Sequence, residues 1–247
     1  MKLTPREVEK PWGRDDGSGR RIGEIWFEAP DGRALPLLVK YLFTSDKLSV
    51  QVHPDDANAR ARALPHGKSE CWYVVAAEPG AKLALGLREG MGEAELRAAA
   101  ADGSIEARLD WIEPRAGDFF SVPAGTIHAI GPGLSLIEIQ QPSDVTYRLY
   151  DYGRDRELHV EDAVAVANLS PSPQSRRRAG PHSGVLLNAP PFSVAYVAAG
   201  EADPFAGLER WVIPLTGGTG DCFYLEPGEP DPPPEHGPRL VASVNKI

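Results

Sequence analysis

The chain has 247 residues, of which 26 are Lys or Arg and 35 are Asp or Glu, so its formal net charge at neutral pH is −9. This acidic balance argues against nucleic acid as the main partner. Hydrophobic residues make up 42% and charged residues 25%, a composition typical of globular rather than disordered proteins. No apolar stretch approaches the roughly 20 residues that span a bilayer.

Two further features predict a cytoplasmic protein. The N-terminal segment lacks the apolar core of a secretory signal. Cys71 and Cys222 are far apart in the sequence, and both stand among strand-forming residues. This setting favours buried free thiols over a disulfide.

Short β-type runs separated by turns dominate the first part of the chain. Turn residues such as Pro30-Asp31-Gly32 and Gly131-Pro132-Gly133 interrupt the apolar runs. Strands of this length and spacing predict a β-sandwich or barrel. The expected strands cover 22–27, 37–43, 47–52, 71–76, 82–87, 118–122 and 134–140.

Three segments have helical character. Residues 55–64 open with two acidic residues, which suit a helix N-terminus. Residues 92–102 are rich in strong helix formers, and 157–169 carry apolar residues at helical spacing. We therefore expect short helices beside a mainly β structure.

Composition also predicts the division of the chain into domains. Residues 171–183 are rich in Pro, Ser and Arg, which is typical of a linker. Residues 184–247 contain a few more strand-like runs, too few for a second domain of full size. We expect a main domain over 1–170 and a small C-terminal β subdomain over 184–247.

Four residues in three motifs form a candidate metal site. Gln51 and His53 share one face of an expected strand, because alternate residues of a strand point the same way. Glu70 opens another expected strand, and His128 follows a tight Pro-x-Gly turn. Two imidazoles, one carboxylate and one amide oxygen suit a divalent first-row metal. One ligand charge leaves a positive centre, which suits a hydroxyl-rich or anionic substrate.

These motifs carry a family resemblance. The pattern Gly117-x5-Pro123-x-Gly125-x2-His128 resembles the second motif of the cupin superfamily. The segments LSVQVHPDD, GKSECWYV and VPAGTIHAIGPGLSLIEIQQPSDVTYRLYDYGR closely resemble the type I mannose-6-phosphate isomerases in their short bacterial form, over roughly residues 36–165. The resemblance implies an all-β double-stranded β-helix, or jelly roll, with short helices.

The resemblance also implies a set of site residues. It implies one Zn²⁺ per chain, and other divalent first-row metals suit the same donors. The family's zinc ligands correspond to Gln51, His53, Glu70 and His128. Its substrate-lining lysines, active-site arginine and acidic site residues correspond to Lys40, Lys68, Arg148, Glu138 and Asp144.

The implied reaction is the interconversion of mannose 6-phosphate and fructose 6-phosphate. A proton moves between C2 and C1 through an enediol, whose negative charge must be stabilised. Lys40, Lys68 and Arg148 are the candidate cations for the sugar phosphate. The base is left open between Glu138, Asp144 and a metal-bound water. Without the family, Lys40 and Glu138 could face solvent, and Asp144 could be a turn former.

Two other functions fit the same residues. One is isomerisation of a different sugar or sugar phosphate, and the other is a metal-binding cupin that binds a sugar without turnover. The C-terminal region lacks a second Pro-x-Gly-x-x-His and is shorter than the family's usual C-terminal domain, which bears on the substrate rather than on the metal. We expect a small sugar phosphate as partner, no nucleic acid or membrane, and a monomer or weak homodimer.

Overall fold

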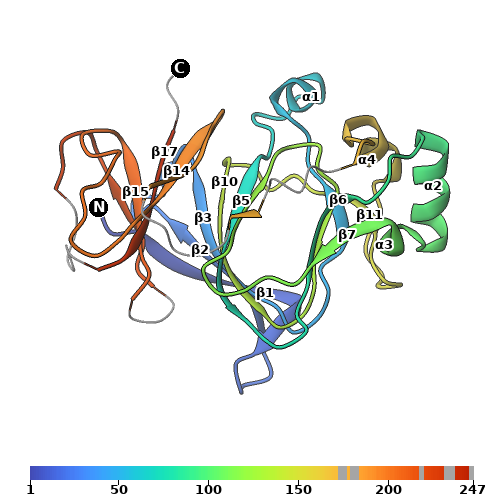
Figure 1. Ribbon diagram of the computed structural model, residues 1–247, viewed down its shortest axis with the longest axis horizontal. Helices are drawn as coiled ribbons and strands as arrows, with labels where there is room; N and C mark the ends of the chain where they lie inside the picture. The colour runs from blue at the N-terminus through green and yellow to red at the C-terminus, as the bar shows by residue number, and fades with distance from the viewer. Residues whose placement is uncertain (172–176, 179–183, 217–219, 231–236, 245–247) are drawn as a thin grey trace.

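The computed structural model describes residues 1–171, 177–178, 184–216, 220–230 and 237–244 (Figure 1). Three antiparallel sheets make up the fold. The first has seven strands, in the order β1 (Thr4–Asp15), β2 (Arg21–Glu28), β3 (Leu38–Phe43), β10 (Leu134–Gln140), β5 (Glu70–Ala77), β8 (Phe119–Val122) and β12 (Arg177–Arg178). The predicted all-β class, a double-stranded β-helix of the cupin kind with short helices, is confirmed.

The other two sheets have five strands each. The opposing sheet runs in the order β11 (Tyr147–Tyr150), β4 (Val50–Val52), β9 (His128–Ile130), β6 (Leu83–Leu87) and β7 (Leu109–Ile112). The C-terminal sheet runs in the order β13 (Gly184–Ala189), β14 (Phe192–Val197), β17 (Arg239–Val244), β15 (Arg210–Pro214) and β16 (Phe223–Leu225).

The seven-stranded and opposing sheets pack face to face and enclose an apolar core at one end of the barrel. Trp72, Phe120 and Leu136 from the seven-stranded sheet meet Leu83 and Leu85 from the opposing sheet. Alternation along each strand sends every second side chain into this space. The barrel therefore has a filled apolar end, and the polar residues collect elsewhere in its interior.

The outer faces of the two barrel sheets are covered by different elements. Apolar residues of α2 (Glu93–Asp102), α3 (Ile105–Arg108) and α4 (Val160–Val166) form one cluster with the outer face of the opposing sheet. The C-terminal sheet packs on the outer face of the seven-stranded sheet, where Ile137 and Ile139 lie in one apolar cluster with Trp211. Figure 1 shows the C-terminal sheet and the helices on opposite sides of the barrel.

The three expected helices are present, each with tighter bounds than predicted. Helix α1 (Asp56–Ala61) begins after Asp55, whose side chain accepts a hydrogen bond from the Asn58 backbone N–H. The expected strand over 47–52 is shorter in the structure, where β4 begins at Val50. The structure adds β1, β7, β9, β11, β12 and α3, which were not predicted, and β12 lies within the expected linker. Most of β1 is exposed at the sheet edge and it contains Pro5 and Pro11, so it lacks the apolar alternation of a half-buried strand.

Several other expectations concern the rest of the chain. Most of the expected linker over 171–183 lies outside the described residues. Cys71 and Cys222 are both buried and free, as predicted. Within the ranges that the structure describes, no helix has the length and apolar character needed to cross a membrane.

Candidate metal centre

Three predicted ligands meet in the barrel interior. His53 directly follows β4, Glu70 opens β5 and His128 opens β9, and all three side chains are buried. Their nearest ligand atoms all lie within 4.8 Å of one another. Nε2 of His53 is 3.5 Å from one Glu70 carboxylate oxygen, and Nε2 of His128 is 3.5 Å from the other. The two imidazoles thus converge on one carboxylate.

Two glycines allow the backbone to bring these residues together. A Cβ on Gly67 would lie 2.5 Å from the backbone carbon of Asp55, so only glycine permits this close approach of the chain beside Lys68. Gly125 has a φ of +82°, which favours glycine, and its N–H donates to the backbone oxygen of His53. The turn before His128 is thereby fixed to the end of β4.

The fourth predicted ligand, Gln51, faces the same cluster with its amide nitrogen. Nε2 of Gln51 is 3.1 Å from Nε2 of His128, while Oε1 accepts a hydrogen bond from the Ser49 hydroxyl at 3.0 Å. Ligation through Oε1 therefore requires rotation of the amide. Register places Gln51 opposite His128 on the neighbouring strand β9.

The protonation of the imidazoles suits metal ligation. Nδ1 of His128 lies 2.9 Å from the backbone oxygen of Thr126, so Nδ1–H donates and Nε2 keeps its lone pair toward the cluster. Burial lowers the pKa of His128 to about 4 and the pKa of His53 well below its usual value. Both rings are neutral at physiological pH, as metal ligands must be.

The Glu70 carboxylate completes the donor set. Burial and the nearby charge of Glu138 raise the pKa of Glu70 to about 7, although Lys68 acts in the opposite direction. Oε1 of Glu70 is buried and accepts no hydrogen bond from the described residues. A buried carboxylate oxygen facing an imidazole lone pair is a donor arrangement that fits a divalent cation.

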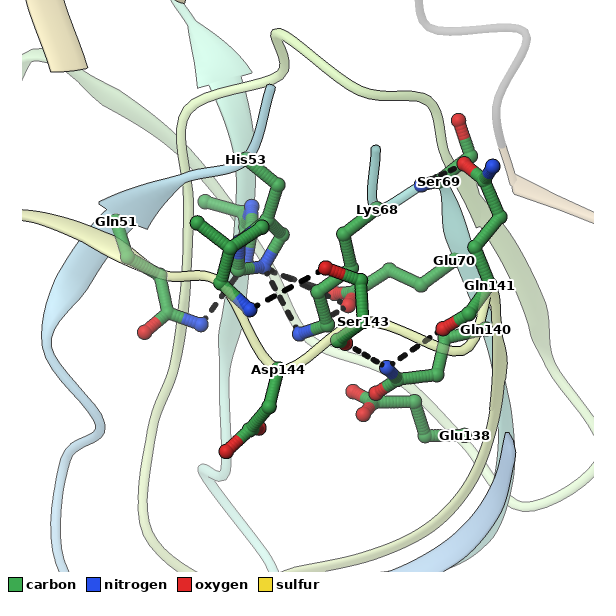
Figure 2. A network of polar contacts seen from close by, with 12 residues as sticks. Gln51, His53, Lys68, Ser69, Glu70, Glu138, Gln140, Gln141, Ser143 and Asp144 are labelled. Atoms are coloured by element: carbon green, nitrogen blue, oxygen red, sulfur yellow. Dashed lines mark hydrogen bonds and ion pairs between the residues drawn. The ribbon is translucent and has the colours of Figure 1, made fainter. Parts of the chain in front are cut away.

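Lys68 enters this cluster directly. Its Nζ lies 2.9 Å from Oε2 of Glu70 and 3.1 Å from Nε2 of His53. Figure 2 shows the lysine side chain reaching toward both residues. Burial alone would lower the pKa of Lys68, but the Glu70 and Glu138 carboxylates raise it above its usual value, so the ammonium stays charged.

A polar cavity adjoins the cluster. Among the predicted site residues, Gln51, Lys68, Lys40, Glu138, Asp144 and Arg148 all line it. Lys40 is buried 3.5 Å from Glu138 and 3.8 Å from Asp144. Glu138 also accepts a hydrogen bond from Nε1 of Trp72 at 3.0 Å. The side chain of Asp144 is 64% exposed, and in Figure 2 its carboxylate points away from the imidazoles.

Arg148 lies opposite Gln51 in the pairing of β11 with β4. Its guanidinium forms no ion pair among the described residues, and its buried Nε makes no hydrogen bond there. Burial and the positive charge of Arg156 lower its pKa. The cavity thus keeps a cation that is not neutralised by a neighbouring carboxylate.

Three other charged residues line the cavity but were not predicted as site residues. Lys10 lies 3.4 Å from Glu24, which is buried, and Arg156 is held by the buried Asp151 at 2.6 Å. The sequence offered a clue to Glu24, because it is an acidic residue inside the apolar run 22–27. The sequence offered no such clue to Lys10, because its strand β1 lacks the alternation of a half-buried strand.

Comparison with known proteins gives related sequences. No family model matches the chain. It is 44% identical over 171 residues to a mannose-6-phosphate isomerase of Streptococcus mutans, covering 64% of this chain and 53% of the relative. It is 36% identical over 198 residues to the mannose-6-phosphate isomerase ManA of Bacillus subtilis, covering 74% of this chain and 62% of the relative. The chain spans about half the length of the first relative and less than two thirds of the second.

Solved structures share the fold over nearly the whole chain. The crystal structure of the mannose 6-phosphate isomerase from Bacillus subtilis superposes with a TM-score of 0.72 at 25% identity, covering 98% of each chain. A putative mannosephosphate isomerase from Archaeoglobus fulgidus gives a TM-score of 0.68 at 18% identity, covering 99% of this chain and 97% of the other. The resemblance predicted from the sequence is confirmed, and the chain is related to the mannose-6-phosphate isomerases in sequence and in fold.

Proposed function

We propose that this protein is a metal-dependent aldose-ketose isomerase that interconverts mannose 6-phosphate and fructose 6-phosphate. The observation that carries this proposal is the buried group of His53, Glu70 and His128 beside a cavity lined by cations and carboxylates. Named relatives with this activity support the choice of substrate. The main region over 1–170 would hold the site, the stretch 171–183 would link it to the rest, and 184–247 would cover the outer face of the seven-stranded sheet.

We assign the metal to Gln51, His53, Glu70 and His128, with zinc as the preferred ion. A solved mannose 6-phosphate isomerase that shares this fold is bound with zinc, at 15% identity and a TM-score of 0.66. When bound, the ion supplies a Lewis acid that stabilises negative charge on the sugar oxygens. The Nδ1–H bond to Thr126 would hold the Nε2 lone pair of His128 ready for the ion, and Gln51 would offer Oε1 if its amide were rotated.

The cavity residues bind and orient the sugar phosphate. Arg148 lines the cavity and its Nε makes no hydrogen bond among the described residues, so it is available to an incoming phosphate or sugar hydroxyl. Lys40 and Lys68 add positive charge that favours the enediolate over the neutral sugar.

Two carboxylates that line the cavity are candidates for the base that takes the C2 proton. The pKa of Glu138 is lowered, since Lys68 and Lys40 outweigh the effect of burial, so it is ionised and able to accept a proton. Asp144 is exposed and lies in the loop between β10 and β11. Matched variants Glu138→Gln and Asp144→Asn separate the roles, because loss of the base lowers kcat by roughly 10²–10⁴-fold.

A coupled assay with mannose 6-phosphate tests the function. Turnover that is lost with a chelator and restored by Zn²⁺ is the expected result. Turnover with another aldose or its phosphate, but not with mannose 6-phosphate, would change the substrate and keep the reaction class. Binding of metal and sugar phosphate without turnover would replace the isomerase by a sugar-binding cupin.

A further inference from the structure

The ammonium of Lys68 and a metal ion require the same atoms. Nζ of Lys68 lies 2.9 Å from Oε2 of Glu70 and 3.1 Å from Nε2 of His53. Nε2 of His53 has a single lone pair, which either accepts a hydrogen bond from the ammonium or ligates a metal. Two cations at this separation from one carboxylate also repel each other strongly in a buried site.

The side chain of Lys68 has somewhere else to go. Gly67 fixes the backbone before it, so the movement falls on the four-carbon side chain. Lys68 already lines the polar cavity, where Glu138 and Arg148 also lie. Glu138 carries a negative charge that can receive the ammonium at this second position. The alternative to the Glu70 contact is therefore an existing polar cavity and not an apolar wall.

We propose that Lys68 is a built-in competitor for the metal position, and that a divalent metal binds only when the ammonium leaves Glu70 and His53 for the polar cavity. This inference rests on the proposed function, because it takes those two residues as metal ligands. Metal loading then separates the Lys68 ammonium from the Glu70 carboxylate and leaves its charge available to the sugar phosphate in the cavity. By thermodynamic reciprocity, the sugar phosphate also tightens metal binding.

Removal of the ammonium tests the competition. Lys68→Met removes the charge, and Lys68→Leu does the same without offering a sulfur ligand. The matched control is Lys40→Met, because Lys40 is a second buried lysine of the same cavity that pairs with Glu138 and Asp144 rather than with the metal cluster. Zn²⁺ affinity of each full-length protein would be measured by calorimetric titration at about pH 8, where carboxyl groups near the site are ionised.

Both Lys68 variants should bind Zn²⁺ more tightly than the wild type by roughly tenfold or more, whereas Lys40→Met should change the affinity by less than about threefold. In the wild type, saturating mannose 6-phosphate should tighten Zn²⁺ binding, and this coupling should be smaller in Lys68→Leu, where only the direct contact between ion and sugar remains. Equal tightening in Lys40→Met would show a general charge effect and overturn the competition. Unchanged or weaker affinity in both Lys68 variants would also overturn it, while metal binding by the wild type would leave the proposed function standing.

A structural measurement covers the case in which the variants fail to fold. Crystals of the wild-type protein with bound Co²⁺ should show Nζ of Lys68 beyond hydrogen-bond distance of both Glu70 and His53. An ammonium that keeps both contacts beside the bound ion would overturn the inference. Failure of the proposed function is recognised separately, as a protein that binds Zn²⁺ and does not turn over mannose 6-phosphate.

Discussion

The two faces of β10 have opposite characters, although the residues that form them alternate along one strand. On the inner face, Glu138 contacts Lys40 and Trp72 and lines the polar cavity. On the outer face, Ile137 and Ile139 are buried in the apolar cluster shared with the C-terminal sheet. The period of two in a strand places a charge and a core side chain back to back over Ile137–Ile139, where the pairing with β5 is regular.

The comparison shows that the two faces contribute differently to stability and function. Apolar burial on the outer face stabilises the fold by about 25 cal/mol per Å². Buried ion pairs on the inner face lose hydration and regain little stability, so their retention is better explained by function. We therefore expect inner-face substitutions to change binding and catalysis, and outer-face substitutions to change the free energy of unfolding.

The largest effect is expected for His128→Ala on the inner side. Loss of an imidazole ligand should weaken metal binding and lower kcat/KM by roughly 10³-fold or more. Metal content and the coupled assay measure the two effects, with circular dichroism to confirm folding. A variant that binds metal normally and retains its activity would exclude His128 as a ligand. It would also contradict the expectation that substitutions on the inner side change binding and catalysis.

Arg148→Ala should have the next largest effect, and mainly on KM. A charge-assisted hydrogen bond to phosphate contributes about 1.5–3 kcal/mol, so KM for mannose 6-phosphate should rise by roughly 10- to 100-fold while Zn²⁺ affinity changes little. Arg148→Lys should restore part of the loss, since it keeps the charge without the planar fork. An unchanged KM would place the phosphate elsewhere in the cavity.

Alternation along 134–140 identified the two faces of β10, but it did not show which of them faces the barrel interior. Alternation in 134–140 put Leu136, Glu138 and Gln140 on one face, but it could not separate solvent from a barrel interior. Long-range packing settles this question, because Trp211 of the C-terminal sheet, distant in sequence, packs in one cluster with Ile137 and Ile139 and covers the apolar face. The all-β class was predictable because the strand runs of the first 170 residues are strongly apolar and regularly interrupted, whereas the double-stranded β-helix was predicted from the family resemblance.

Local spacing identified the residues of the metal cluster but not their detailed contacts. His53 directly follows a strand, and Glu70 and His128 each begin one beside a turn, and these are signals that a sequence displays. The position of Lys68 between two of them depends on side-chain packing, as does the amide orientation of Gln51. Lys10 lies on β1 and Arg156 lies in the loop after β11, and neither segment was predicted to line the site.

The pH dependence of metal binding distinguishes the carboxylate from the imidazoles. Burial and the Glu138 charge raise the pKa of Glu70 to about 7, whereas burial lowers the pKa of His128 to about 4. Below pH 7 the Glu70 carboxyl takes up a proton that the metal must displace, so Zn²⁺ affinity should fall about tenfold per pH unit between roughly pH 6.5 and 5. Titrations across this range measure the slope. A slope of two protons would mean that an imidazole also takes up a proton in this pH range, which contradicts the lowering of its pKa by burial.

The smallest effect is expected from Ile137→Val on the outer face. The substitution removes one buried methylene from the cluster with the C-terminal sheet and should lower the free energy of unfolding by about 0.5–1.5 kcal/mol. Denaturant unfolding measures this loss, and Zn²⁺ affinity with its pH slope should equal that of the wild type. A change in metal affinity would show that packing against the C-terminal sheet positions the neighbouring Glu138. The two faces would then be mechanically coupled through the β10 backbone, and the C-terminal sheet would influence the cavity without lining it.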